Sequence, residues 1–339
     1  MKKIVVIGSA NMDTTHYLST EFPEGVTQES LNEVVKTVRV LGGKGANQAR
    51  ASKLQSKDAD VYFIGCIGLD EEGHSMLQEF SRVGVNYAGV KALEGMSTDG
   101  RIISVDKNGN NSMMGYGDCV KQLKPDVINM TILEMADIVA IQMKMPAETV
   151  KFVIDYCQKH NKTLVIDPTP PEKASILLEN GAELLKQGTY FTPNEEEAFA
   201  LIKYEEGKTI DEIKREFNAT PKEKRLKMIE EFVAKYPNVI ATIGGDGVIY
   251  KSNGRVVRKD TYPTECKDST GAGDTFNGAF IASIARGESI DQAVEFGLMA
   301  SSIKVRYEGA QNGVPDYETT KDAIEKAKRT RKPREIVEE

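Results

Sequence analysis

Histidine and cysteine are scarce in this chain of 339 residues, which carries only 3 histidines and 4 cysteines. The four cysteines are scattered along the chain, and no two of them form a C-x-x-C pair. This isolation argues against a zinc centre, a redox dithiol and a catalytic histidine, and it predicts reduced, mostly buried thiols. The residues concerned are His16, His74, His160, Cys66, Cys119, Cys157 and Cys266.

Long apolar runs and an excess of positive charge are also missing. No segment approaches the roughly 18 consecutive apolar residues of a membrane span. Met1 to Lys3 lead directly into the apolar run Ile4–Ile7, which is too short for a signal peptide. The formal net charge of -7 and the pI of about 5.4 argue against a nucleic-acid partner. We therefore expect a cytoplasmic protein that binds small molecules, with neither a membrane nor nucleic acid as its partner.

Short apolar segments alternate with longer amphipathic ones along most of the chain. This alternation is typical of an α/β fold with a doubly wound, mostly parallel sheet and helices on both faces. With 40% hydrophobic residues, the chain can bury one large core with a modest appendage, or two ordinary domains. Strands are predicted at 4–7, 61–65, 138–141, 163–166, 190–192 and 239–242, and helices at 45–54, 72–83, 147–160, 195–202 and 222–235.

Ligands of such a sheet bind beyond the carboxyl ends of its strands. Five polar or small residues fall just there, namely Asn11, Asp13, Asp167, Asn194 and Gly244. We therefore expect the functional site at this edge of the sheet.

Two regions depart from the alternation. Residues 14–40 and 87–115 alternate polar and apolar side chains, and Lys107-Asn-Gly-Asn110 is typical of a hairpin turn. Because neither region is long enough to fold alone, we expect one small β appendage on a core made of 1–13, 41–86 and 116–330.

Two further stretches are rich in charge. Residues 203–237 are interpreted as a solvated insertion with an extra helix at 208–217. From Thr320 a charged helix is expected to fray into a flexible tail at 331–339, or alternatively to contact a partner subunit.

The most informative motif is Asp268-Ser-Thr-Gly-Ala-Gly-Asp274-Thr-Phe-Asn-Gly-Ala-Phe280, which places a carboxylate directly behind a glycine turn that opens a helix. Because glycine lacks a Cβ, the backbone N–H groups of Gly271, Ala272 and Gly273 can approach an anion closely. Asp274 then stands where a phosphoryl transfer would need a general base for the attacking hydroxyl. The pattern also fits an ordinary helix cap.

A second glycine-rich stretch, Leu41-Gly-Gly-Lys-Gly-Ala-Asn-Gln-Ala49, also precedes a helix. It puts the Lys44 ammonium and the Asn47 amide beside a flexible backbone, and polyol hydroxyls need such donors and acceptors. Alone, it is also compatible with a loop that carries a solvated lysine. Together, in this order and at this separation, the two motifs resemble the signatures of the ribokinase-like (pfkB-type) family of carbohydrate kinases. The resemblance runs from about Lys3 to about Pro315.

The segment Ile4-Val-Val-Ile-Gly-Ser-Ala-Asn-Met-Asp13 resembles the family's first strand and its sugar-binding Asn and Asp. Residues 14–40 and 87–115 stand where the family has a small β-sheet lid. Closure of such a lid over the sugar would exclude water from a transfer that otherwise becomes ATP hydrolysis. The resemblance implies that the sugar is held by Asn11, Asp13, Gly43, Lys44 and Asn47.

Two later segments resemble nucleotide-binding parts of the family. Thr192-Pro-Asn-Glu-Glu-Glu197 resembles its N-x-x-E element, which implies that Asn194 and Glu197 organise Mg²⁺ through water and the phosphates of ATP. Thr242-Ile-Gly-Gly-Asp-Gly247 resembles its nucleotide loop and implicates Thr242, Gly244 and Gly247. Taken alone, the first pattern is also that of a solvated helix start, and the second that of a hairpin turn.

The resemblance implies a direct, in-line transfer of the γ-phosphoryl group of ATP to a sugar hydroxyl, with Asp274 as the base. The chain has no Walker A loop, so the phosphates would rely on the turn Gly271–Gly273.

The resemblance further implies a K⁺ site made of Asp268, Thr270 and backbone groups around 303–313, Gly313 included. Glu308-Gly-Ala-Gln311 resembles the late turn that closes over the nucleotide and helps to hold this cation. After it, Asn312-Gly313 replaces a Pro-Ser or similar pair that is frequent in the family. This difference predicts one missing side-chain ligand and a weak dependence on K⁺.

The full motif GGKGANQA is closer to the ribokinase branch than to the phosphosugar or nucleoside branches, so ribose or a related free sugar is the expected substrate. Where that branch typically has a glutamate that reaches the sugar, this chain reads Met143-Lys144-Met145-Pro146. A lysine ammonium cannot accept a hydroxyl proton. Lys144 therefore either points to solvent or attracts an acidic or phosphorylated sugar. A nucleoside kinase and a non-catalytic sugar sensor are further alternatives, and a homodimer through the lid is expected by analogy.

Overall fold

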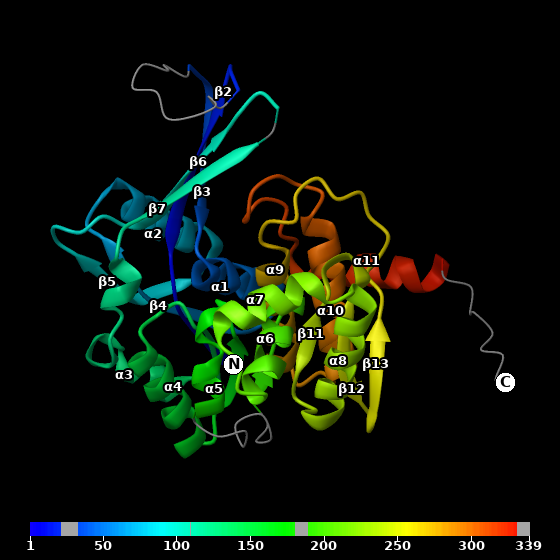
Figure 1. Ribbon diagram of the computed structural model, residues 1–339. Coiled ribbons are helices and arrows are strands. Elements are labelled where there is room, and N and C mark those ends of the chain that lie inside the picture. Colours follow the sequence, from blue (N-terminus) through cyan, green and yellow to red (C-terminus); the bar gives the residue numbers. More distant parts are fainter. Residues whose placement is uncertain (22–32, 109, 180–188, 331–339) are drawn as a thin grey trace.

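A six-stranded parallel sheet forms the centre of the computed structural model, which describes residues 1–21, 33–108, 110–179 and 189–330 (Figure 1). The strand order is β10-β9-β8-β1-β4-β5, and every neighbouring pair is parallel. The expected fold class is thereby confirmed. The strands are β1 (Lys3–Ile7), β4 (Asp60–Gly68), β5 (Asn86–Leu93), β8 (Ile138–Gln142), β9 (Thr163–Asp167) and β10 (Tyr190–Phe191).

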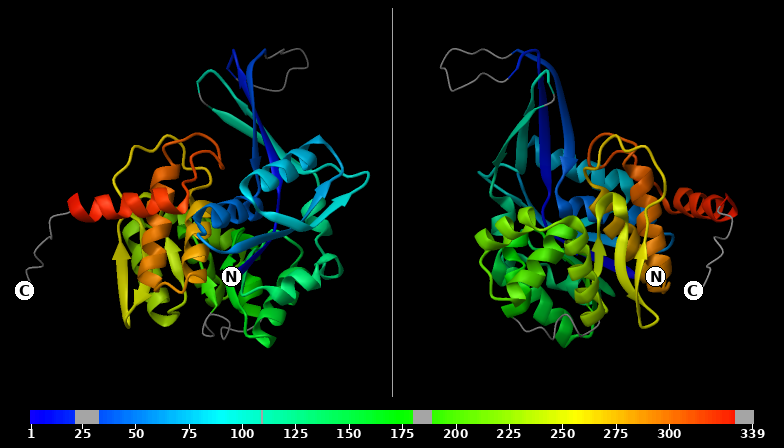
Figure 2. Two further views of the ribbon diagram at one scale, coloured as in Figure 1. Left: turned by 180° about the vertical axis from the view of Figure 1, so that it is seen from behind. Right: turned by 45° about the vertical axis from the view of Figure 1, so that its right-hand side comes forward.

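Helices cover both faces of this sheet (Figure 2), because each central strand is apolar on both sides. In β1, Ile4 and Val6 belong to one buried cluster, whereas Val5 and Ile7 belong to another. The first cluster includes side chains of α1 (Lys44–Gln55), α2 (Glu71–Val83), α9 (Ala272–Ala285), α10 (Ile290–Lys304) and α11 (Tyr317–Thr330). The second includes side chains of α3 (Met130–Met135), α4 (Ala147–Lys159), α5 (Ser175–Glu179), α6 (Glu195–Glu205) and α8 (Lys222–Lys235).

A three-stranded antiparallel sheet continues the fold beyond β10. It consists of β11 (Ile240–Thr242), β12 (Val248–Ser252) and β13 (Arg255–Lys259). Single parallel bridges, Phe191 with Val239 and Asn194 with Thr242, tie β11 to the edge of the central sheet. The expected strand at 239–242 is therefore present, and its end lies beside the start of α6.

A four-stranded sheet, which we call the small sheet, projects from the core (Figures 1 and 2). Its order is β3 (Val34–Gly42), β2 (Asn11–Leu18), β6 (Asp99–Val105) and β7 (Asn111–Tyr116). β6 and β7 pair antiparallel, as the hairpin motif predicts, although Gly109 lies outside the described residues. β2 follows β1 after residues 8–10 alone, so the small sheet is rooted at the carboxyl end of the central strand.

The expected appendage differs from the small sheet in one segment. β5 falls inside 87–115, yet it pairs with β4 at the edge of the central sheet. Its residue Val90 packs against the core cluster of α1 and α2, so burial as well as pairing holds β5 there. Only the later part of that segment, from β6 onward, belongs to the small sheet.

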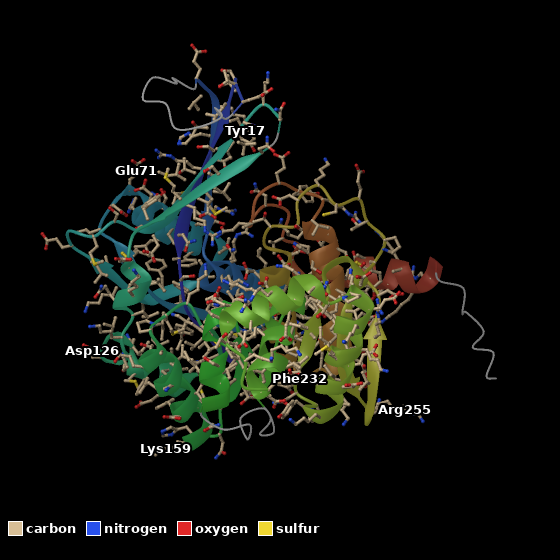
Figure 3. All side chains as sticks on the ribbon, in the orientation of Figure 1. Tyr17, Glu71, Asp126, Lys159, Phe232 and Arg255 are labelled. Atoms are coloured by element: carbon tan, nitrogen blue, oxygen red, sulfur yellow. The ribbon has the colours of Figure 1, made fainter. Side chains whose placement is uncertain are left out.

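The charged stretch 203–237 is only partly solvated. α7 (Ile210–Ala219) begins with a capping box of Thr209 and Glu212, and its Phe217 packs edge-on against Phe199 of α6 at a ring distance of 5.5 Å. α8 buries Leu226, Ile229, Phe232 and Val233, which recur at helical spacing, and Figure 3 shows Phe232 among the core helices. The interpretation as a solvated insertion is therefore wrong for α8.

The remaining expectations for the terminal region and the thiols can be checked in the described residues. The charged helix from Thr320 is present as part of α11, while the tail 331–339 lies outside the described residues. All four cysteines are free, and only Cys266 is exposed. Among residues 1–21, 33–108, 110–179 and 189–330, no helix has the length and apolar character needed to cross a membrane.

Helices α1 and α9 approach each other closely in the middle of the molecule. A Cβ on Gly278 of α9 would lie 2.3 Å from the Cβ of Ala51 and 2.7 Å from the backbone N of Ser52. A glycine is needed here because the two backbones leave no room for a side chain. The same approach brings the amide of Asn47 on α1 within 2.8 Å of Asp274 on α9.

We expect Gly278→Ala to lower the free energy of unfolding by roughly 1–3 kcal/mol, because the added methyl group overpacks the contact with α1. The loss should appear although alanine at an exposed helix position is more stabilising than glycine by about 1 kcal/mol. Urea denaturation of the purified variant measures it.

Gly273→Ala in the same helix is the matched control, since a Cβ there meets no atom within 4 Å. Its free energy of unfolding should equal or exceed that of the parent. Equal stability of the two variants would show that α1 and α9 do not make this contact.

Candidate active site

Two cavities meet at the N-terminus of α9. The first has a volume of about 300 Å³ and is lined by every residue expected to bind the nucleotide: Asn194, Glu197, Thr242, Gly244 and Gly247. The second, of about 190 Å³, is lined by the residues expected to hold the sugar: Asn11, Asp13, Gly43, Lys44, Asn47 and Lys144. Lys44 and Gly273 line both cavities, and Asp274 lines the second. The structure thus brings two distant sequence motifs to one point.

The turn between β3 and α1 presents the first motif. Gly43 has a φ of 91°, and a Cβ there would lie 2.6 Å from the Ser9 carbonyl oxygen. Only glycine permits this close approach to the connection between β1 and β2. Lys44, Asn47 and Gln48 follow at positions i, i+3 and i+4 of α1, so their side chains share one face of the helix.

The turn before α9 presents the second motif. Gly271 is the N-cap residue with a φ of 77°, and a Cβ there would lie 2.4 Å from the Ala310 carbonyl oxygen. No side chain caps this helix, which excludes the interpretation of Asp274 as an ordinary cap. The N–H of Ala272 donates to the Ser269 carbonyl oxygen at 3.1 Å. Among the described residues, the N–H groups of Gly271 and Gly273 have no such partner and remain available to an anion.

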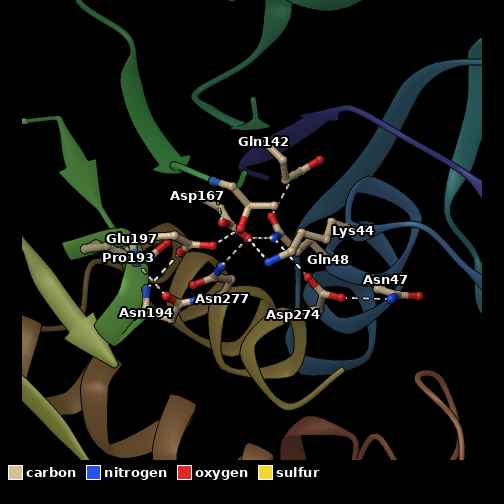
Figure 4. Close-up of polar contacts among 12 residues, drawn as sticks. Lys44, Asn47, Gln48, Gln142, Asp167, Pro193, Asn194, Glu197, Asp274 and Asn277 are labelled. Carbon is tan, nitrogen blue, oxygen red and sulfur yellow. Dashed lines mark hydrogen bonds and ion pairs between the residues drawn. The ribbon is translucent and has the colours of Figure 1, made fainter. Parts of the chain in front are cut away.

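Asp274 is held in place by two amides of α1 (Figure 4). Its Oδ2 accepts a hydrogen bond from Asn47 Nδ2 at 2.8 Å, and its Oδ1 accepts one from Gln48 Nε2 at 3.2 Å. Gln48 in turn accepts a hydrogen bond from Gln142 Nε2 at 2.7 Å. This chain fixes the orientation of the Asp274 carboxylate before any ligand binds.

Asp167, at the carboxyl end of β9, is the second centre of the cluster (Figure 4). Its Oδ2 accepts from Lys44 Nζ at 3.1 Å, from Gln48 Nε2 at 2.8 Å and from Asn277 Nδ2 at 3.4 Å. Gln48 therefore connects Asp167 to Asp274, and Lys44 supplies the positive charge that both carboxylates share.

Burial makes the Asp274 carboxyl group easier to protonate. It raises the pKa of Asp274, and the negative charge of Asp167 adds to the effect, whereas Lys44 opposes it. For Lys44, burial acts to lower the pKa, but the charges of Asp167, Asp274 and Glu197 outweigh it and raise the pKa above its usual value. Asp274 is thus a stronger proton acceptor than an exposed aspartate.

Asn194 and Glu197 first of all build the start of α6. Asn194 Oδ1 accepts from the Glu197 N–H at 2.8 Å, and Glu197 Oε2 accepts from the Asn194 N–H at 2.9 Å, which is a capping box. Glu197 is only 3% exposed and also accepts a hydrogen bond from the Thr169 hydroxyl, so this helix start is not simply solvated. Burial, aided by Asp167, raises the pKa of Glu197 to about 7.

The residues expected to bind K⁺ make several contacts within the described parts of the chain. The Asp268 carboxylate accepts from the N–H groups of Thr270 at 2.8 Å and Gly309 at 2.7 Å. Thr270 lines the second cavity instead. Gly313 lies under the ring of Tyr307, where a Cβ would be 2.0 Å from Cδ2. The ammonium of Lys304 donates to the Asp268 carbonyl oxygen at 3.2 Å.

Sequence analysis did not assign a role to several residues of the site. Gln48 and Asn277 lie inside the two motifs, so a signal existed for both. Sequence analysis places Asp167 at the ligand-binding edge of the sheet but gives it no role in the site. Arg101 of β6 lines the second cavity and Lys304 ends α10, and no local pattern marks either of them.

Comparisons with known proteins extend over nearly the whole chain. The profile described as pfkB family carbohydrate kinase matches residues 1–317. A ribokinase of Bacillus subtilis (strain 168) is 31% identical over 324 residues, which cover 93% of this chain and 97% of that protein. A ribokinase structure from Thermotoga maritima, 27% identical, superimposes with a TM-score of 0.74 and covers 96% of this chain and 100% of that one.

A ribokinase of Arabidopsis thaliana, solved in complex with ribose and ATP, also superimposes with a TM-score of 0.74. It is 24% identical and covers 96% of this chain and 99% of that one, which shows that the two proteins share a fold.

We expect Asn194→Ala to lower the free energy of unfolding by about 1 kcal/mol, because it removes the cap of α6 and half of the capping box. Asn194→Asp is the matched control, since a carboxylate caps a helix as well as an amide does. Urea denaturation of both variants measures the difference. Equal losses in the two variants, or none in either, would contradict a capping role for Asn194.

Proposed function

The chain belongs to the pfkB family of carbohydrate kinases, and we propose that it transfers the γ-phosphoryl group of ATP to a hydroxyl of ribose or a closely related free sugar. One observation carries this proposal. Asp274 lines the smaller cavity and directly follows Gly273, which lines both, beside free N–H groups at a helix start, and two amides of α1 fix its carboxylate. The ribokinases reported above, one of them solved with ribose and ATP, support the choice of both substrates.

In this proposal the sugar occupies the smaller cavity. Asn11 and Asp13 of β2 face it from the small sheet, and Lys44 and Asn47 face it from α1. Asp13 Oδ1 is buried without a hydrogen-bond partner among the described residues, so a sugar hydroxyl would satisfy it. Because β2 and β6 carry part of the wall, movement of the small sheet would open and close the sugar site.

The nucleotide occupies the larger cavity, with its γ-phosphoryl group at the start of α9. The N–H groups of Gly271 and Gly273 donate to the phosphoryl oxygens and stabilise the charge that develops during transfer. Ala272 contributes no donor, because its N–H is already bonded to Ser269. Asp274 takes the proton of the attacking hydroxyl, and Lys44, which lines both cavities, offers its charge to the phosphoryl group between them.

Mg²⁺ fits the larger cavity by the chemistry of its donors. Asp167, Asn194 and Glu197 offer the carboxylate and amide oxygens that this ion prefers, and they would hold it through water. When bound, the ion would neutralise charge on the nucleotide phosphates.

Two further expectations stay proposals. The exposed apolar side chains Val34 and Val35 on β3, with Met113 and Met114 on β7, line both edge strands of the small sheet, which favours a homodimer through that sheet. A cytoplasmic location agrees with a sugar and ATP as the substrates.

Asp274→Asn should lower kcat by roughly 10²–10⁴-fold while the affinity for ATP stays close to that of the parent, because only the proton acceptor is lost. Burial raises the pKa of Asp274, so the parent should lose activity toward acid at a higher pH than an exposed aspartate would allow. The pH profile of kcat for the variant should not show this loss of activity toward acid. Steady-state rates across pH, with ATP affinity from calorimetry, measure both. Near-normal turnover by a folded variant would remove Asp274 from the mechanism.

One feature of the sugar cavity favours a second candidate, a kinase for a sugar acid or phosphosugar. Lys144 and Arg101 both line that cavity, and neither side chain forms an ion pair within the described parts of the chain. Burial lowers the pKa of Lys144, and the positive charges of Arg101 and Lys44 lower it further. An anionic substrate would relieve this repulsion. The interpretation of Lys144 as a solvent-facing side chain finds no support in this placement.

Lys144→Glu decides between the two substrates. If Lys144 contacts the substrate, kcat/KM for ribose should rise, and kcat/KM for a sugar acid or phosphosugar should fall, each by about tenfold or more. Lys144→Met, which removes the charge without reversing it, should give an intermediate ratio. Measuring all three proteins on ribose and on one acidic sugar tests this, and an unchanged ratio of specificity constants would rule out a role of Lys144 in selecting charge.

A further inference from the structure

Lys304 is a fully buried lysine outside both cavities. It is the last residue of α10, its side chain is 0% exposed, and its Nζ donates to the carbonyl oxygens of Asp268 at 3.2 Å and Tyr307 at 3.5 Å. Lysine is almost never fully buried unless its charge is compensated. Here burial lowers the pKa of Lys304, and the end of a helix, two carbonyl dipoles and the nearby Asp268 carboxylate offset part of that effect.

The Lys304 ammonium lies where hydrogen bonds join the segment before α9 to the segment after α10. The Val305 carbonyl oxygen accepts from the N–H groups of Lys267 at 2.8 Å and Asp268 at 3.1 Å. The Asp268 carboxylate then binds the N–H groups of Thr270 and Gly309. Thr270 leads directly into the turn that precedes α9, so the position of Asp268 sets the position of the N–H groups that face the phosphoryl group.

The family's K⁺ does not fit beside this ammonium. The Lys304 ammonium already binds the carbonyl oxygens of Asp268 and Tyr307, and Tyr307 lies in the segment 303–313 from which the resemblance draws backbone ligands. A second positive charge next to it would be repelled at low dielectric. Position 313, where the resemblance places a side-chain ligand, is a glycine covered by the Tyr307 ring. The chain itself therefore occupies part of the donor set that the K⁺ site would use.

We propose that the Lys304 ammonium takes the place of the monovalent cation and orders the turn before α9, so that activity does not depend on K⁺. Lys304 is a positioning residue that acts through Asp268, and it contacts neither the sugar nor the nucleotide cavity. The role rests on the proposed kinase function, but the binding of a cation can be tested without any substrate. Because the charge is tethered covalently, no ion has to be bound before the turn is ordered.

The first experiment uses the parent protein. Rates at saturating ATP and ribose are measured in KCl, NaCl and tetramethylammonium chloride at constant ionic strength, together with the melting temperature in each salt. We expect equal rates and equal melting temperatures. A saturable rise in rate or in melting temperature that is specific for K⁺ overturns the proposal by itself, whether or not any variant folds.

The second experiment removes the ammonium. In tetramethylammonium chloride, Lys304→Ala should lose about tenfold or more in kcat, because the phosphoryl-binding N–H groups are no longer fixed. K⁺ or NH₄⁺ should enter the vacated space, restore kcat and raise the melting temperature in a saturable manner. Lys304→Met fills the space without a charge, so its low kcat should not respond to either ion.

Lys162→Ala is the matched control, because the Lys162 ammonium also binds two carbonyl oxygens, those of Glu134 and Ala136, but far along the chain from this turn. Its kcat should equal that of the parent in all three salts. Rescue of Lys304→Met by K⁺, or full activity of Lys304→Ala in tetramethylammonium, would overturn the proposal. If no sugar supports turnover, the melting temperatures of Lys304→Ala with and without K⁺ still decide it.

Discussion

The close contact between α1 and α9 is the constraint on which the rest of the site depends. Gly278 lets the two helices approach, and this approach brings the amides of Asn47 and Gln48 to the Asp274 carboxylate. Without it, the sugar motif and the phosphate turn would be two separate loops. The large apolar clusters on both faces of the sheet supply the free energy that holds such a contact in place.

The site places several charged side chains close together, and such an arrangement is stable only when opposite charges and hydrogen bonds compensate them. Burial and the charge of Asp167 raise the pKa of Asp274 and of Glu197, and the charges of all three carboxylates act on Lys44. Amides from α1 and α9, together with the hydroxyl of Thr169, satisfy the carboxylate oxygens. This arrangement is preorganised, because the polar groups are already oriented toward the place where a phosphoryl group would carry charge.

Two lysines distinguish this chain from the pattern expected for its family. Lys144 places a positive charge in the sugar cavity where a carboxylate was expected, and Lys304 places one at the turn where a free cation was expected. Burial lowers the pKa of both lysines, and acidic neighbours offset part of this effect, Asp274 and Asp13 for Lys144 and Asp268 for Lys304. The fold is common to the family, whereas the electrostatics around the reacting groups belong to this chain.

The sequence by itself determined what depends on neighbours in the chain. Apolar runs predicted most of the central strands. The glycine turns before α1 and α9 and the N-x-x-E element of Asn194 and Glu197 were recognisable as motifs, because a few adjacent residues set their backbone geometry. Tertiary structure alone decided that β5 joins the central sheet, that α8 is buried, and that Arg101, Lys144 and Lys304 face particular groups. The sequence around a lysine does not tell whether its side chain is solvated, because its environment is set by residues far along the chain: Asp268 for Lys304, and Arg101 for Lys144.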